Sequence, residues 1–239
     1  MKHNICLILI FFTTISLAQQ QKGMSVHYKT TSLYDLEALD AETKSSPTKM
    51  KYLIQMKENF ESIEYLLKIK EGKSIFETIK KMDVSSKNPN LLQSTQEDQL
   101  FYVDSEQYIE ELKAFGGKVL ITETSNERQW NLTKEKREIL GKQCYKATYN
   151  EKKGEKTINV EAWFAPDLPY QFGPKGYHGL PGLILELKYN NVLTYTADKI
   201  NWNEELHVEK PSKGRKMLRA EFNEMVGNAV ENLKSGSKN

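Results

Sequence analysis

Short runs in which apolar and polar residues alternate recur through most of this chain of 239 residues. In the clearest run, every second residue from Ile63 to Ile69 is apolar, which is the pattern of a strand with one buried face. Glycine or asparagine turns separate the runs at intervals of roughly ten to fifteen residues. Because parallel strands need a crossover helix between them, this spacing favours an antiparallel meander. We therefore predict a mainly β protein.

Further runs of this kind lie at residues 24–28, 75–79, 101–103, 119–124, 144–148, 158–164 and 192–200. Other segments are less regular. Residues 33–48 are polar and fit a loop or a short helix at 33–39, with a breaker at Ser45–Pro47. The alternation from Met50 to Met56 is weak, and the segment from Tyr108 to Phe115 is ambiguous.

The C-terminal segment has a different period. After Pro211–Gly214, apolar residues recur at intervals of three and four from Leu218 to Leu233. This pattern predicts an amphipathic helix over about residues 214–234, with Ser212 or a neighbour as its N-cap. Its apolar face fits packing on the sheet, and the alternative is a partner groove or a membrane surface.

The first 18 residues have the pattern of a secretory signal peptide. Lys2 and His3 precede an apolar core from Ile5 to Leu17, and Ser16-Leu17-Ala18 supplies small residues for cleavage. The apolar run is short for a membrane core of about 30 Å, which argues against an uncleaved anchor. We therefore predict export, a mature chain that begins at Gln19, a single β-rich domain over residues 19–239, and no transmembrane span in that domain.

Charge and cysteine content exclude some classes of function. The 34 basic and 32 acidic residues are well mixed along the chain, which argues against a nucleic-acid binder. Cleavage would remove Cys6 and leave Cys144 alone, so an intramolecular disulfide is excluded. Because Cys144 lies in a strand-like stretch, we expect a buried, structural thiol.

The sequence contains none of the common catalytic or cofactor motifs: no G-x-S-x-G, H-E-x-x-H, Walker loop, G-x-G-x-x-G or C-x-x-C. His27, His178 and His207 lie far apart in sequence, so no local metal-ligand pair exists. We therefore assign no catalytic residue, metal or cofactor.

A Gly/Pro-rich loop carries the candidate ligand-binding residues, which are His178, Tyr170 and Tyr177. A histidine that titrates near neutral pH, on a loop rich in aromatic residues, suits binding or catalysis. The alternative is a hydrolase that uses His178 with an acid such as Asp167.

The loop leads into the most apolar run of the mature chain. Leu183, Leu185 and Leu187 alternate with Ile184, Glu186 and Lys188, which predicts a strand that is buried on one face. Asn190-Asn191 then fits a tight hairpin turn with positive φ at both residues. Before the strand, the turn residues Gly179, Pro181 and Gly182 favour a structural role for this stretch, as a hinge that fixes the strand's register.

The hexapeptide Gly179, Leu180, Pro181, Gly182, Leu183 and Ile184 spells GLPGLI. It resembles the signature of the GLPGLI family, exported proteins of Bacteroidota-type bacteria whose activity is uncharacterised. Trp130–Thr133, Cys144 and Glu161–Ala165 resemble further elements of that family, so the likeness extends from about Trp130 to Tyr195. The resemblance implies the periplasm or cell envelope and no enzyme class.

The strand pattern also resembles that of envelope carriers with a half-barrel sheet, which is an analogy of fold alone. It refines the expected fold to a curved antiparallel sheet or half-barrel with a C-terminal α-helix. Aromatic residues of such an open sheet can line an apolar cleft. Our hypothesis is therefore a non-enzymatic binding or carrier module for an apolar or extended ligand or an envelope protein. The alternatives are the His178 hydrolase and a scaffold subunit of an outer-membrane complex, which an exposed apolar patch on the helix would favour.

Overall fold

The computed structural model describes residues 23–32, 41–79, 99–125, 128–153 and 156–236. The predicted signal peptide, the expected mature start at Gln19 and the possible helix at 33–39 lie outside these residues. The strands are β1 (Met24–Ser32), β2 (Glu64–Lys70), β3 (Lys73–Ile79), β4 (Leu100–Val103), β5 (Gln107–Ala114), β6 (Gly117–Thr124), β7 (Asn131–Ile139), β8 (Lys142–Lys153), β9 (Lys156–Ala165), β10 (Leu183–Tyr189), β11 (Leu193–Trp202) and β12 (Arg215–Leu218). The helices are α1 (Ala41–Ser45), α2 (Pro47–Ser62), the short 3-10 helix η1 (Pro174–Gly176) and α4 (Arg219–Gly236).

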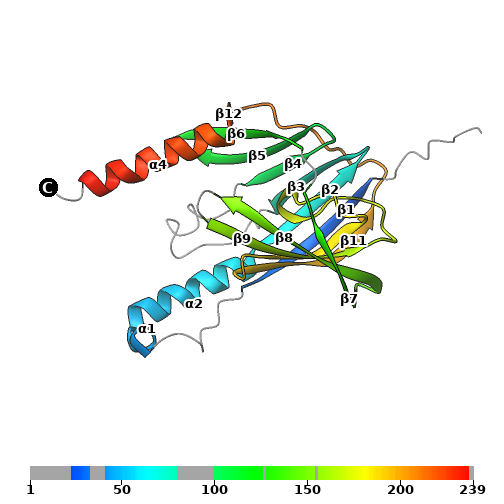
Figure 1. Ribbon diagram of the computed structural model, residues 1–239, viewed down its shortest axis with the longest axis horizontal. Coiled ribbons are helices and arrows are strands. Elements are labelled where there is room, and N and C mark those ends of the chain that lie inside the picture. The colour runs from blue at the N-terminus through cyan, green and yellow to red at the C-terminus, as the bar shows by residue number, and fades with distance from the viewer. Residues whose placement is uncertain (1–22, 33–40, 80–98, 126–127, 154–155, 237–239) are drawn as a thin grey trace, which may run out of the picture.

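All twelve strands belong to one sheet, in the order β12-β6-β5-β4-β3-β2-β1-β11-β10-β9-β8-β7. Every neighbouring pair is antiparallel except β12 and β6, which run parallel. The sheet does not close, and β1 stands between two wings that curve toward each other (Figure 1). The prediction of a mainly β protein with a curved antiparallel sheet and a C-terminal helix is confirmed.

The period-two pattern identified the central strands correctly. Met24, Val26 and Tyr28 are fully buried along β1, and the apolar residues of β2 alternate in the same way. The predicted hairpin at Asn190-Asn191 is also present, with φ of 50° and 53°. Positive φ at both positions is what a tight turn between twisted strands requires.

The structure settles two segments that the sequence left open and changes one prediction. Met50 to Met56 belongs to α2, because Ser46 caps the helix by accepting a hydrogen bond from the Lys49 backbone N–H at 3.4 Å, and Pro47 opens it. The ambiguous segment at 108–115 is mostly strand β5. In β10, Ile184 is buried as well, since a β-bulge between Ile184 and Glu186 interrupts the simple alternation.

The C-terminal helix begins later than predicted. Residues 215–218 form β12, whose pairing with β6 replaces the first turn of the expected helix. The cap is not Ser212, because the Leu218 backbone N–H donates to Glu221 Oε2 at 2.9 Å instead. Phe222 and Met225 pack against Val119, Ile121 and Met217, so the start of α4 packs on the sheet.

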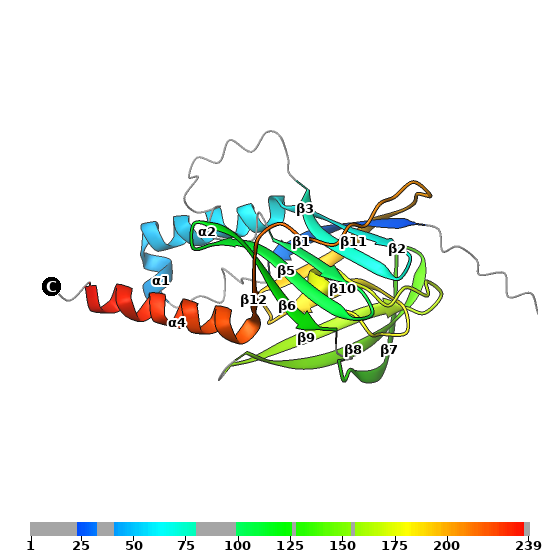
Figure 2. The same ribbon diagram turned by 90° about the horizontal axis from the view of Figure 1, so that it is seen from above.

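Beyond that contact, α4 extends away from the sheet, and α2 projects from the same end of the molecule (Figure 2). Within the described residues, none of the helices has the length and apolar character needed to cross a membrane.

Aromatic side chains fill the inside of the curve. The rings of Tyr65 and Phe76 stack with centroids 5.2 Å apart, and Tyr28 and Tyr195 meet Phe76 edge-on. Cys144 is a free, buried thiol, in agreement with the prediction. This core positions the long loop between β9 and β10, which carries all the candidate site residues.

Candidate functional site

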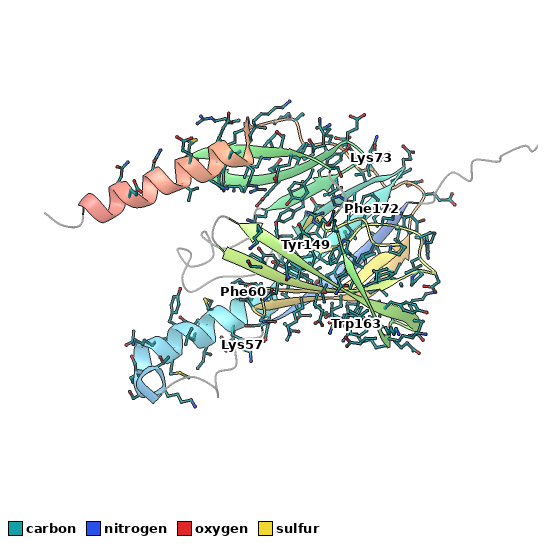
Figure 3. All side chains as sticks on the ribbon, viewed as in Figure 1. Lys57, Phe60, Lys73, Tyr149, Trp163 and Phe172 are labelled. Atoms are coloured by element: carbon teal, nitrogen blue, oxygen red, sulfur yellow. The ribbon has the colours of Figure 1, made fainter. Side chains whose placement is uncertain are left out.

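The loop formed by residues 166–182 folds back on itself between the two wings of the sheet. Two backbone N–H groups of β10 donate to it: Leu183 to Leu168 O at 2.9 Å, and Ile184 to Phe172 O at 3.0 Å. Figure 3 shows Phe172 of the loop and Tyr149 of β8 in the space between the wings. Much of the loop is therefore packed in the interior of the fold, while residues such as Asp167 and Gly179 are exposed.

Two glycines let the loop pass close to its neighbours. A Cβ atom on Gly182, whose φ is +158°, would lie 2.3 Å from the Ala165 carbonyl oxygen. A Cβ atom on Gly176, at φ +70°, would lie 2.6 Å from the ring of Tyr108 on β5. Side chains cannot approach so closely, so glycine is required at both positions. This contact brings η1 against the β4–β5 wing.

Tyr177 joins the loop to the opposite wing. Its hydroxyl donates a 2.6 Å hydrogen bond to Glu151 Oε2 on β8, and its ring packs near Trp130 and Tyr189. Burial, together with the neighbouring Glu151 carboxylate, raises the pKa of Tyr177 far above the usual tyrosine range. Tyr177 therefore stays a neutral hydrogen-bond donor.

His178 lies next in the chain and contacts several residues from the loop that precedes β7. Its Nε2 lies 3.1 Å from Ser125 Oγ, and its Nδ1 lies 2.7 Å from an N–H of Arg128. The His178 carbonyl accepts a hydrogen bond from Trp130 Nε1 at 2.9 Å. The ring is half-buried.

These contacts indicate which tautomer the His178 imidazole adopts. Because a guanidinium can only donate, Nδ1 of His178 accepts from Arg128, and Nε2 carries the hydrogen that is donated to Ser125. The Gly176 carbonyl, which also lies near Nδ1, accepts from Arg128 at 3.3 Å. A histidine in this form is not a general base toward Ser125.

The other two sequence candidates lie in different contacts. Tyr170 is buried against Trp202, with ring centroids 6.0 Å apart, and burial raises the pKa of Tyr170. Asp167 is exposed and pairs with Lys142 at 2.9 Å; it makes no hydrogen bond with His178. The structure therefore brings His178 and Tyr177 together and leaves Asp167 outside the cluster.

Sequence reasoning missed Ser125 and Arg128. Both lie about fifty positions before His178, in contacts with sequence separations of 53 and 50, and no local motif marks them. The Arg128 guanidinium lies 4.7 Å from the centroid of the Tyr177 ring and 5.9 Å from that of Tyr108. Among the described residues, no group of three His, Cys, Asp or Glu side chains is arranged to hold a metal ion.

The fold is similar to part of a larger protein of known structure. PNGF-II in space group P21 matches at 13% identity and a TM-score of 0.53, over 85% of this chain and 33% of that one. The C2 crystal form matches at 12% identity and a TM-score of 0.55, over 86% and 32% of the two chains. The chain thus spans about a third of the PNGF-II chains, and at this identity the likeness shows the fold alone.

No curated protein matches this chain. One family model matches a short region of the chain, and that region contains Tyr177, His178 and the GLPGLI hexapeptide. Residues 149–186 match the model of a family described as "Protein of unknown function (Porph_ging)".

Proposed function

We propose that this protein is a non-enzymatic binding module of the cell envelope, exported by the predicted signal peptide and related to GLPGLI proteins. The observation that carries the proposal is the position of its exposed apolar side chains. Tyr52 and Ile54 on α2 are 49% and 39% exposed, and Val226 on α4 is 39% exposed. Both helices project from the same end of the molecule (Figure 1). We call these three residues the helix-end surface, although they lie on two helices and Tyr52 and Ile54 face different sides of α2.

The loop between β9 and β10 is the reason for choosing this surface over the inside of the curved sheet. The sequence suggested that a ligand would bind inside the curved sheet. Tyr177 and Leu180 of the loop occupy part of that interior and are packed in its core. Apolar side chains that water can reach are therefore a better basis for binding than the strands around the loop.

A co-purification experiment tests the binding role. The native protein would be isolated under mild detergent and analysed by mass spectrometry for bound lipid, peptide and protein. The test variant carries Tyr52→Ser, Ile54→Ser and Val226→Ser. The matched control carries Leu132→Ser and Leu140→Ser, which alter exposed apolar residues at and beside the β7 edge.

The proposal predicts a component that is retained by the native protein and the control and lost by the helix-end variant. A recovered lipid or peptide identifies a carrier, whereas a recovered protein identifies a scaffold subunit. A native protein with no bound component, or equal retention by all three forms, contradicts it.

A second candidate is the hydrolase, because Ser125 Oγ lies 3.1 Å from His178 Nε2, within the reach of a nucleophile and its base. Against it, Arg128 rather than a carboxylate contacts Nδ1, so the ring donates to Ser125 instead of accepting. Hydrolysis of p-nitrophenyl esters by the native protein, abolished by both Ser125→Ala and His178→Asn, would establish this alternative. Equal background rates in all three would eliminate it for these substrates.

A further inference from the structure

Arg128 differs from the other partly buried arginines of the described chain. Arg137 pairs with Glu186, and Arg219 pairs with Glu110 and Glu123. Within the residues that the structure describes, Arg128 has no ion pair with any carboxylate, although it too is half-buried. Removing a charge from water without a counter-charge is unfavourable, and no carboxylate of the described residues pairs with this guanidinium to offset that cost.

Neutral groups hold Arg128 in place without balancing its charge. One terminal nitrogen donates to Gly176 O and to His178 Nδ1, and the guanidinium plane lies near the Tyr177 ring. The Glu151 carboxylate accepts a hydrogen bond from the Tyr177 hydroxyl on the same ring. Both hydrogen bonds of Arg128 use that one nitrogen, so Nε and the second terminal nitrogen make none with the residues that the structure describes. Those two nitrogens form the edge of a guanidinium that binds two oxygens at once.

Ser125 adds a further donor beside the same imidazole. Since His178 Nε2 donates to Ser125 Oγ, the serine hydroxyl hydrogen is directed away from the ring and is available to an acceptor. Arg128 and Ser125 thus each present a hydrogen-bond donor beside one histidine, and the unused edge of the Arg128 guanidinium suits an anion with at least two oxygens.

We infer that Arg128 and Ser125, held by His178, form a binding site for an oxyanion group of a ligand, either a carboxylate or a phosphate. The site lies at the Gly/Pro loop and is separate from the helix-end surface, so it does not depend on the proposed function. His178 is a positioning residue here: it orients both donors and does not contact the anion.

Anion titration of the full chain tests the site. Arginine Nε–H signals of the ¹⁵N-labelled protein would be followed by NMR; with four arginines in the sequence, they can be assigned from single variants. Sodium phosphate and sodium acetate, each to about 50 mM, are compared with sodium chloride at equal ionic strength. Saturation by phosphate alone identifies a phosphate site, and saturation by acetate identifies a carboxylate site.

The Arg128 signal should shift saturably with at least one of the two anions and not with chloride. Arg128→Lys, which keeps the charge and loses the planar fork, should weaken the affinity about tenfold. Arg215→Gln, at an exposed arginine, removes a charge elsewhere and should leave the affinity unchanged. Ser125→Ala should weaken it severalfold, and serves as the test should Arg128→Lys fail to fold.

The absence of saturation with both anions would overturn the inference. An equal response of the Arg128 and Arg215 signals would do so as well, because it would indicate nonspecific attraction to positive charge. Unchanged affinity in Arg128→Lys, or in Ser125→Ala where the lysine variant does not fold, would also contradict the site.

Discussion

The Tyr177 hydroxyl donates a 2.6 Å hydrogen bond to Glu151 Oε2, joining the Gly/Pro loop to the edge of the sheet that contains β8. Tyr177→Phe removes this donor, so the half-buried Glu151 carboxylate loses the hydrogen bond from Tyr177. We predict a loss of about 1–3 kcal/mol in the free energy of unfolding, measured by urea denaturation. Tyr52→Phe, at an exposed tyrosine, should change that free energy by less than about 0.5 kcal/mol. Equal stability of the two variants would show that the hydrogen bond contributes nothing to the fold.

Gly182→Val should destabilise the protein. The new Cβ would lie 2.3 Å from the Ala165 carbonyl oxygen, and valine disfavours φ of +158°, so we expect a cost of at least about 1–3 kcal/mol. Gly227→Ala is the matched control, because that glycine lies in α4 with open space around its Cβ. Alanine there should stabilise the helix by about 0.5–1 kcal/mol. A thermal midpoint that Gly182→Val leaves unchanged would refute the close approach.

Asp104 should make stability depend on acid pH. Burial tends to raise the pKa of this carboxyl, but hydrogen bonds from the Glu106 and Gln107 backbone N–H groups and from the Tyr102 hydroxyl outweigh it and hold the pKa below its usual value. A lowered pKa means that the carboxylate stabilises the fold above about pH 4, and that this contribution disappears as the pH falls through the folded-state pKa.

The difference in unfolding free energy between the native protein and Asp104→Asn should therefore be largest near neutral pH and shrink as the pH falls through the lowered pKa of Asp104. Asp198→Asn, which removes an exposed ion pair with Lys29, controls for the general loss of a negative charge. A difference between native protein and Asp104→Asn that stays constant with pH would contradict the assignment.

Cys144 should be unreactive in the folded protein. Burial raises the pKa of its thiol to about 11, so almost none is thiolate at pH 8. In a Cys6→Ser variant, where one thiol remains, alkylation should be slow in buffer and fast in urea. Rapid alkylation of the folded protein would show that Cys144 is an accessible, activated thiol.

The sequence predicted elements whose signals are local. The alternation in β2 and the Asn190-Asn191 turn follow from side-chain spacing and backbone preference, and both are present. The weak alternation at Met50–Met56 was misleading, because Ser46 and Pro47 act as a helix start rather than as a breaker alone. Strand β12 was missed, since its pairing with β6 joins residues about a hundred positions apart.

In the candidate site too, the sequence indicated the local features and missed the long-range contacts. The turn residues marked the Gly/Pro loop, whereas the close approach of Gly182 to Ala165 became visible only in the structure. Ser125 and Arg128 contact His178 across 53 and 50 sequence positions, and no pattern of spacing encodes that contact. Sequence proximity suggested Asp167 as a partner for His178. Asp167, just after β9, instead pairs with Lys142 at the start of β8.

Site-specific photo-cross-linking in intact cells tests the central proposal most directly. A photoreactive residue would replace Val226 in the helix-end surface or, as the control, Leu132 at the sheet edge opposite β12. The proposal predicts a discrete cross-linked component at position 226, found in the cell-envelope fraction, and none at position 132. Cross-linking at neither position, or the same products at both, would contradict a binding module that acts through its helices.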